Sequence, residues 1–224
     1  MRWFTLLQAI ALVACMVRTL AGQGCQPASG SPLTARVRNF VSNDERRLSA
    51  LVRLGLENGL CFGIETVTRS LNEKITLRLF KTDAQSAIKA VLGSQREYDI
   101  TLLHNVILIR DKRVPPPEYL AVRLPRFRIP RSRLDEANLN LFISLETHLA
   151  HSPFGVAGDG PPGDPTDRVG PFDTTGQTVR DLLCQVVGNS KGATWIFTSP
   201  VAPAPPPSSI NRRWSLVLYR IADY

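Results

Sequence analysis

The chain has 224 residues, enough for one large domain or for two domains of roughly 80–100 residues each. Its hydrophobic content of 43% is that of a globular protein and excludes an intrinsically disordered chain. The net charge of +8 is concentrated in Lys112–Arg133, where seven basic residues face the single acid Glu118. This concentration excludes a chain-wide nucleic-acid footprint, so we expect no nucleic-acid partner.

The N-terminus has the pattern of an export signal, which we place at residues 1–21. A basic start precedes Trp3–Val17, an apolar run that is short for a membrane span and typical of a signal-peptide core. Two processing sites compete. Leu12–Cys15 resembles a bacterial lipoprotein box, with Cys15 as the lipidated residue, whereas Thr19–Ala21 suits ordinary cleavage before Gly22. An uncleaved anchor is the third alternative. All three predict an exported protein, either periplasmic or membrane-anchored.

Residues 22–35 are rich in Gly, Ser, Pro and Gln, and we expect them to form a flexible tether. Residues 36–113 are expected to form a first module. Ser42-x-x-Glu45 has the spacing of a capping box that opens a helix, and His104-Asn105 predicts a short hairpin connection. The predicted elements are a strand at 36–41, a helix ending near Asn58, strands at 60–67 and 75–80, a helix at 84–92, and hairpin strands at 98–103 and 106–110.

Residues 114–130 are expected to form a basic, proline-marked connector, with a strand at Tyr119–Leu124 and a second strand at Arg126–Ile129. A second, more divergent module is placed at residues 119–224. Thr178-x-x-Asp181 predicts a capping box at the start of its last helix. The other predicted elements are a helix with an apolar stripe of Leu134, Leu139, Phe142, Ile143 and Leu145–Leu149, strands at 154–156 and 169–174, and closing strands at 193–198 and 214–221.

The two halves resemble each other. The apolar positions of the helix ending at Gly93 recur 95 residues later in the helix ending at Gly188, and Phe62–Ile64 matches Phe154–Val156. Amphipathic helices align easily with one another, but here the order, caps and terminal glycines agree as well. The sequence therefore predicts an α+β fold of two tandem β-α-β-β-α-β-β units, with small mixed sheets packed on paired helices.

The segments RRLSALVRLGLENGLCFGIE, KITLRLFKTDAQSAIKAVL and YDITLLHNVILI follow the apolar pattern of a known family. Together they resemble the secretin and TonB short N-terminal domain, well over Arg36–Asp111 and more weakly over Tyr119–Ile221. The resemblance implies a small α+β module on the periplasmic side of the cell envelope that docks with protein partners and has no catalytic activity. It supplies no residues with chemical roles.

Catalytic and metal-binding patterns are weak. The chain has three histidines; His148 and His151 lack a third ligand at a suitable spacing, so surface histidines are expected. No GxSxG motif accompanies them, and a hydrolase is supported only by the presence of Asp, Ser and His. Cys25, Cys61 and Cys184 have no CxxC spacing and are expected to be buried free thiols, although a disulfide among them is left open. We expect no catalytic residues, no cofactor and no metal.

The candidate interaction surface is a basic strip of five arginines, Arg123, Arg126, Arg128, Arg131 and Arg133. In an exported protein such a strip could bind an envelope protein, an anionic membrane or lipopolysaccharide. The alternative is a solvated edge strand whose charges resist aggregation. The sequence favours a non-catalytic envelope module for protein–protein interaction. The second hypothesis is a small-ligand binding protein whose site lies between the two units and is lined by Trp195, Phe197 and Trp214.

Overall fold

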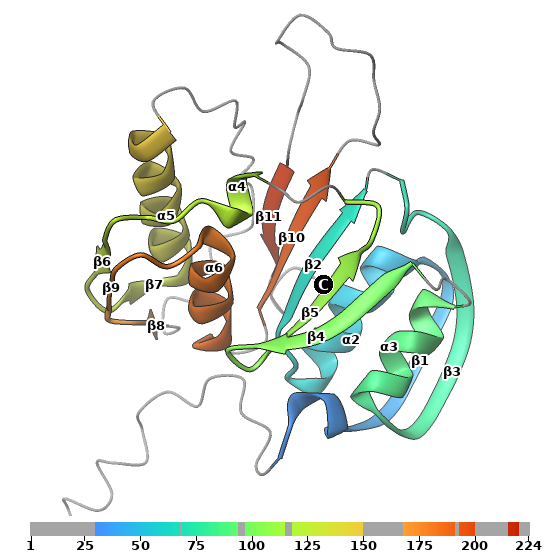
Figure 1. Cartoon of the computed structure of the whole chain (residues 1–224). Coiled ribbons are helices and arrows are strands. Elements are labelled where there is room, and N and C mark those ends of the chain that lie inside the picture. The colour runs from blue at the N-terminus through green and yellow to red at the C-terminus, as the bar shows by residue number, and fades with distance from the viewer. Residues whose placement is uncertain are drawn as a thin grey trace, which may run out of the picture.

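The computed structural model describes residues 30–67, 69–93, 97–114, 118–149, 168–190, 193–199 and 215–219 (Figure 1). Several sequence predictions fall outside these ranges: the signal segment with Cys15, Cys25, His151, the strand at 154–156 and Trp214. No helix among the described residues is long and apolar enough to cross a membrane.

Each α-helix of the described chain is followed by two strands. In order they are η2 (Pro32–Thr34), β1 (Arg36–Arg46), α2 (Arg47–Asn58), β2 (Phe62–Val67), β3 (Lys74–Asp83), α3 (Ala84–Leu92), β4 (Tyr98–Leu103), β5 (Val106–Asp111), α4 (Glu118–Ala121), β6 (Phe127–Ile129), β7 (Ser132–Arg133), α5 (Leu134–Leu149), β8 (Arg168–Val169), β9 (Phe172–Thr174), α6 (Val179–Gly188), β10 (Thr194–Ser199) and β11 (Ser215–Tyr219).

A five-stranded mixed sheet of order β11-β10-β2-β5-β4 forms the centre of the molecule. β10, β2 and β5 run parallel, whereas β11 and β4 are antiparallel strands at the two ends of this order. The α+β class predicted from the sequence is therefore confirmed. The halves do not form separate sheets, because β10 of the second half pairs directly with β2 of the first.

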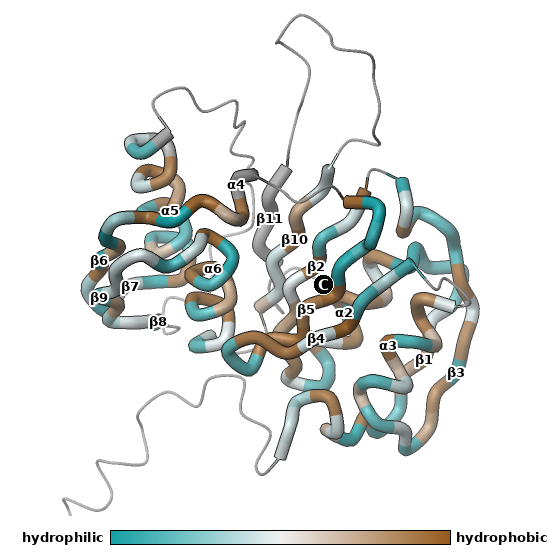
Figure 2. The backbone as a smooth tube through the Cα atoms, viewed as in Figure 1, coloured by the Kyte–Doolittle hydropathy of each residue, from teal (hydrophilic) through white to brown (hydrophobic). Residues whose placement is uncertain are grey.

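The two faces of this sheet belong to different cores. Phe62, Ile64, Ile107 and Ile109 pack with α2 and α3 on one face, as does Ile196 from β10. The alternate residues of these strands, such as Trp195 and Phe197, point to the other face and pack with α5 and α6. Since successive strand residues point to opposite faces, each half of the chain covers one side of a common sheet. Figure 2 shows the hydrophobic residues along the central strands.

Antiparallel two-stranded ribbons lie outside the sheet. The β1–β3 ribbon packs against α2 and α3, and the β6–β9 ribbon belongs to the second half. Figure 1 shows the two ribbons at opposite ends of the molecule. Each half thus contributes an antiparallel strand pair to the common sheet, β4–β5 or β10–β11, and has at least one two-stranded ribbon and two α-helices among the described residues. That the halves are copies of one unit stays a prediction, because the strand at 154–156 lies outside the described residues.

The turn between β4 and β5 matches its prediction. His104 and Asn105 both have positive φ, 49° and 64°, the geometry of a type I′ hairpin turn. The capping box at Thr178 is also confirmed: the Thr178 side chain accepts a hydrogen bond from the backbone N–H of Asp181, whose carboxylate accepts one from the backbone N–H of Thr178.

Four local predictions were wrong. The helix α4 (Glu118–Ala121) overlaps the expected strand Tyr119–Leu124, and Arg123 makes only an isolated bridge. Three prolines precede α4, and proline is tolerated at helix starts. Ser42 does not open a helix, because β1 pairs with β3 as far as Arg46.

Leu139 and Ile143, expected in the core, are 55% and 51% exposed. The end of the expected tether is ordered: η2 lies there, and the Ala35 carbonyl accepts a hydrogen bond from the N–H of Ala84.

Candidate interaction surface

The β6 strand determines where the central part of the basic strip points. Phe127 and Ile129 are buried, and the Phe127 ring lies 6.4 Å from that of Phe172 on β9. Arg128, between them, points to solvent with 71% of its side chain exposed. Apolar and basic residues therefore occupy opposite faces of this strand.

Asp173 on β9 partly neutralises this basic face. Arg126 donates two hydrogen bonds to it, from Nε to Oδ1 at 3.0 Å and from Nη2 to Oδ2 at 2.9 Å. Arg128 is less engaged, with its Nε 3.7 Å from Oδ2. The hydrogen bonds from Arg126, and then the charges of both guanidiniums, lower the pKa of Asp173 below its usual value. Two arginines therefore share one carboxylate, and Arg128 keeps most of its capacity to bind another group.

The structure does not unite the other three predicted arginines into one strip. Arg123 donates from Nη1 to the carbonyl of Gly176 at 2.7 Å, and Arg133 pairs with Asp135 at the start of α5. Arg131 is exposed and forms no ion pair with any residue that the structure describes. Of the five predicted arginines, Arg128 and Arg131 are therefore the most available to a partner.

A hollow of about 510 Å³ opens beside Arg128. It lies at the end of β6 and the start of β9. The lining residues are Arg128, Ile129, Pro130, Pro171, Phe172 and Asp173. The hollow therefore combines an apolar floor and proline walls with one exposed cation and one carboxylate.

The predicted ligand site between the halves is not formed by the residues expected to line it. Trp195 and Phe197 are fully buried in the core of the second half. The Trp195 ring covers Gly63 so closely that a Cβ at Gly63 would lie 2.5 Å from it. Trp195 thus occupies the space between β2 and α6 that a ligand would need, and the prediction that it lines a site was wrong.

Glu65 joins the two halves by a buried ion pair, which the sequence prediction missed. This fully buried carboxylate on β2 accepts hydrogen bonds from Nε and Nη2 of Arg180 on α6, at 2.5 and 3.1 Å. The Nε of Arg110 on β5 lies 3.5 Å from the same carboxylate. A lone acid in the apolar run LCFGIETV was the available signal, because a buried carboxylate requires a cationic partner.

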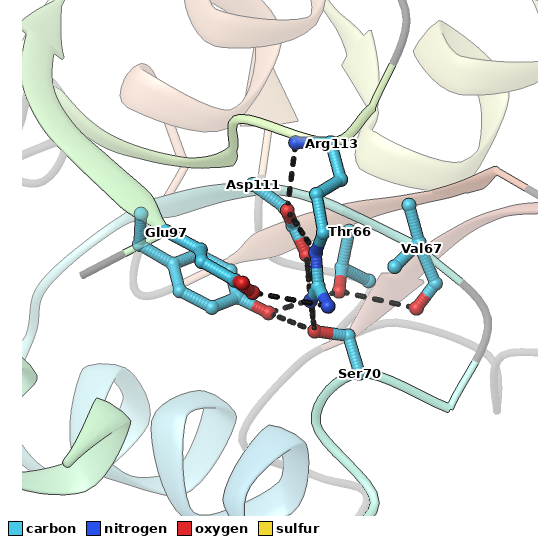
Figure 3. A network of polar contacts seen from close by, with 7 residues as sticks. Thr66, Val67, Ser70, Glu97, Asp111 and Arg113 are labelled. Atoms are coloured by element: carbon cyan, nitrogen blue, oxygen red, sulfur yellow. Dashed lines mark hydrogen bonds and ion pairs between the residues drawn. The ribbon is translucent and has the colours of Figure 1, made fainter. Parts of the chain in front are cut away.

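A second polar network lies where β2 and β5 end (Figure 3). Buried Asp111 accepts hydrogen bonds from the backbone N–H and side chain of Arg113 and from the hydroxyl of Ser70. Burial alone would raise the pKa of Asp111, but these hydrogen bonds lower it below the ordinary value of 3.8. The Ser70 hydroxyl also lies 2.5 Å from that of Tyr98, whose pKa is raised by burial. Because each group already has partners, this network fastens the loop after β2 to β4 and β5.

The cysteines differ from one another. Cys184 is a buried free thiol, as predicted, and burial raises its pKa to about 12, which keeps it protonated and unreactive at neutral pH. Cys61 is disulfide-bonded, so the prediction of a free thiol was wrong there. Its Sγ lies 3.3 Å from the carbonyl of Val187, a packing contact, since a disulfide sulfur has no hydrogen to donate.

The described residues contain no group of three or more His, Cys, Asp or Glu side chains that could hold a metal ion. His148 is exposed near the end of α5. His104, in the turn after β4, has its Nε2 3.9 Å from a carboxylate oxygen of Asp181. Neither histidine lies beside the hollow at β6 and β9, whose lining residues contain no histidine or cysteine.

Comparison with known proteins finds no matching family model, no similar curated protein and no similar solved structure. The resemblance to the secretin and TonB short N-terminal domain therefore stays an expectation based on the sequence pattern.

Proposed function

We propose that this chain is a non-catalytic, exported module of the cell envelope that binds a protein partner in the periplasm or at a membrane surface. The partner binds at the β6–β9 surface, which we define as Arg126, Arg128, Arg131 and the adjoining hollow. The observation that carries the proposal is the position of Arg128, an exposed guanidinium at the mouth of an apolar hollow.

The chemistry of this surface suits an acidic segment that also carries an apolar side chain. Arg128 and Arg131 provide donors for carboxylates, and arginine is the residue best suited to bidentate contacts with them. Ile129, Phe172 and the two prolines provide an apolar floor for one side chain of the partner. Enriched arginine and a desolvated apolar pocket are features of binding hot spots.

Export is supported by the N-terminal pattern and by the disulfide at Cys61, because disulfides persist mainly in oxidising compartments. Asp111 and Glu65 already accept hydrogen bonds from arginine side chains, and Asp111 accepts another from Ser70. Neither buried carboxylate is therefore free to act as an acid or base, which supports the absence of catalysis.

The test is a pull-down from detergent-solubilised bacterial envelope with the chain from Gly22 onward as bait, at low and high salt. Arg128→Ala combined with Arg131→Ala removes the two available cations without breaking the Arg126–Asp173 pair. Arg78→Ala combined with Lys81→Ala, on the distant β1–β3 ribbon, is the charge-matched control.

We expect a partner that the unmodified chain and the control variant both recover at low salt, and that the Arg128 and Arg131 variant loses. High salt should weaken recovery, because exposed charges are screened. Asp173→Ala should increase recovery, since Arg126 and Arg128 then lack their internal acceptor. Equal recovery by all the variants would show that the partner binds elsewhere.

A further inference from the structure

The outer face of the β1–β3 ribbon is the second distinctive surface of the molecule. The inner face, with Phe40 and Leu79, packs on α2 and α3. Phe80 points outward from β3 and is 67% exposed, the largest exposed fraction among the bulky hydrophobic residues that the structure describes. Val41 on β1, which pairs with Arg78, is 39% exposed.

An irregularity in both strands enlarges this face. In a regular strand successive side chains alternate between faces, yet Arg38 and Asn39 are both exposed, and so are Phe80 and Lys81 opposite them. Lys81 has a positive φ of 47°, which changes the direction of β3 at this point. The irregularity thus brings Arg38 and Lys81, which strict alternation would place on the inner face, to the outer face beside Phe80.

The cations of this face have no acidic partner among the residues that the structure describes. Arg38, Arg78 and Lys81 form no ion pair within the described part of the chain. They differ in this from Arg126 and Arg133, which both pair with carboxylates of the second half.

The carboxylates of the same ribbon are occupied elsewhere. Asp44 pairs with Lys74 at the far end, and Glu45 accepts hydrogen bonds from Arg53. Asp83 accepts the backbone N–H of Ser86 at 2.8 Å, as the N-cap of α3. The centre of the ribbon therefore presents three uncompensated positive charges around an exposed phenylalanine.

We propose that this face, defined as Arg38, Val41, Arg78, Phe80 and Lys81, docks on the surface of an anionic phospholipid bilayer. Lysine and arginine near such a surface are attracted by its negative potential, and apolar side chains of a surface-bound segment enter the boundary between headgroups and acyl chains. Phe80 would enter this boundary while the flanking cations contact lipid phosphates. A bilayer fits this face better than a protein partner, because the exposed charged side chains around Phe80 are all cations and an anionic bilayer presents negative charge over its whole surface.

The position of the ribbon is compatible with the proposed protein partner. The β1–β3 and β6–β9 ribbons lie at opposite ends of the molecule (Figure 1). A bilayer bound at Phe80 leaves Arg128 and its hollow accessible. The inference does not depend on the proposed function, since it concerns a different surface and a different class of partner.

The test is co-sedimentation of the chain from Gly22 onward, which retains every described residue, with vesicles. One set contains phosphatidylglycerol and phosphatidylcholine in equal parts, and the other contains phosphatidylcholine alone. The test variants are Phe80→Ser and the double variant Arg78→Ala with Lys81→Ala. The matched controls are Leu139→Ser, another exposed apolar residue, and Arg128→Ala with Arg131→Ala. Circular dichroism and thermal melting confirm that each variant is folded.

We expect binding to the anionic vesicles only. Removing Arg78 and Lys81 should weaken it roughly 25-fold, since each cation contributes about a factor of five. Phe80→Ser should weaken it about tenfold, and the controls should bind like the unmodified chain. Equal binding to the two vesicle sets, or unchanged binding by both test variants, overturns the proposal, as does sedimentation with neither set.

Discussion

The Glu65–Arg180 pair allows a quantitative test of how firmly the two halves are joined. Glu65 lies on β2 in the first half and Arg180 on α6 in the second, and both Glu65 oxygens accept hydrogen bonds from Arg180. Replacing Arg180 by Met leaves a fully buried carboxylate with only the 3.5 Å contact to Arg110. Replacing Glu65 by Met instead leaves two guanidiniums that are partly exposed and can recover some hydration.

These exposures set the expected magnitudes. Breaking a buried ion pair by removing one partner costs about 3–5 kcal/mol. We expect Arg180→Met to lower the free energy of unfolding by about 3–4 kcal/mol, in the lower half of that range, because Arg110 still lies 3.5 Å from the carboxylate. For Glu65→Met we expect only about 2–3 kcal/mol, because the remaining guanidiniums keep part of their solvation. The double variant should cost about 1–2 kcal/mol, because no unpaired buried carboxylate remains.

The assay is urea denaturation followed by tryptophan fluorescence, with circular dichroism as a second probe. Trp195 is fully buried next to Cys184 and Gly63, so its emission reports on the region where the halves meet. A single transition with both probes is expected, since the halves share a sheet. Two separate transitions would refute the reasoning that this pair couples the halves. So would a double variant whose loss of unfolding free energy equals the sum of the losses in the two single variants.

Three further predictions concern single sites. Gly63→Ala should lower the free energy of unfolding by about 1–3 kcal/mol in urea titrations, because the new Cβ would lie 2.5 Å from the Trp195 ring. The free energy of unfolding should decline as the pH falls below 3.8, the ordinary pKa of Asp111, because hydrogen bonds led by those from Arg113 hold the folded-state pKa of Asp111 lower. Asp111→Asn should flatten that part of the pH–stability curve. Cys184, with a pKa of about 12, should resist iodoacetamide at pH about 8 in the folded protein and react after unfolding in urea; rapid alkylation of the folded chain would contradict its burial.

Local signals in the sequence predicted local structure well. The capping box at Thr178 and the turn at His104-Asn105 depend on contacts between neighbouring residues, and both are found. The helix 84–92 has an apolar stripe whose core-facing members are all buried. The same approach failed for Leu139 and Ile143, because α5 has apolar residues around much of its circumference and periodicity alone cannot identify the side that faces the core.

Long-range pairing was not predictable in the same way. Arg180 and Glu65 are 115 residues apart, and although the apolar run around Glu65 indicates that it needs a cationic partner, nothing near it identifies Arg180 as that partner. The pairing of β2 with β10 places strands from both halves in one sheet, whereas a repeat in the sequence suggests two sheets. For the candidate surface, the sequence identified the arginines but not Asp173, which reduces their charge, nor the hollow, which forms only when β6 pairs with β9.

The common sheet also has a consequence for the two proposed surfaces. Because β2 and β10 are hydrogen-bonded neighbours and Glu65 holds α6 to β2, the halves cannot turn freely relative to each other. The β1–β3 face and the β6–β9 surface therefore keep a fixed separation. A chain docked on a bilayer through Phe80 would present Arg128 away from that bilayer at a constant height. The two binding events should then be independent: variants of one face should leave binding at the other unchanged, and the vesicle-bound chain should capture the protein partner as efficiently as the free chain.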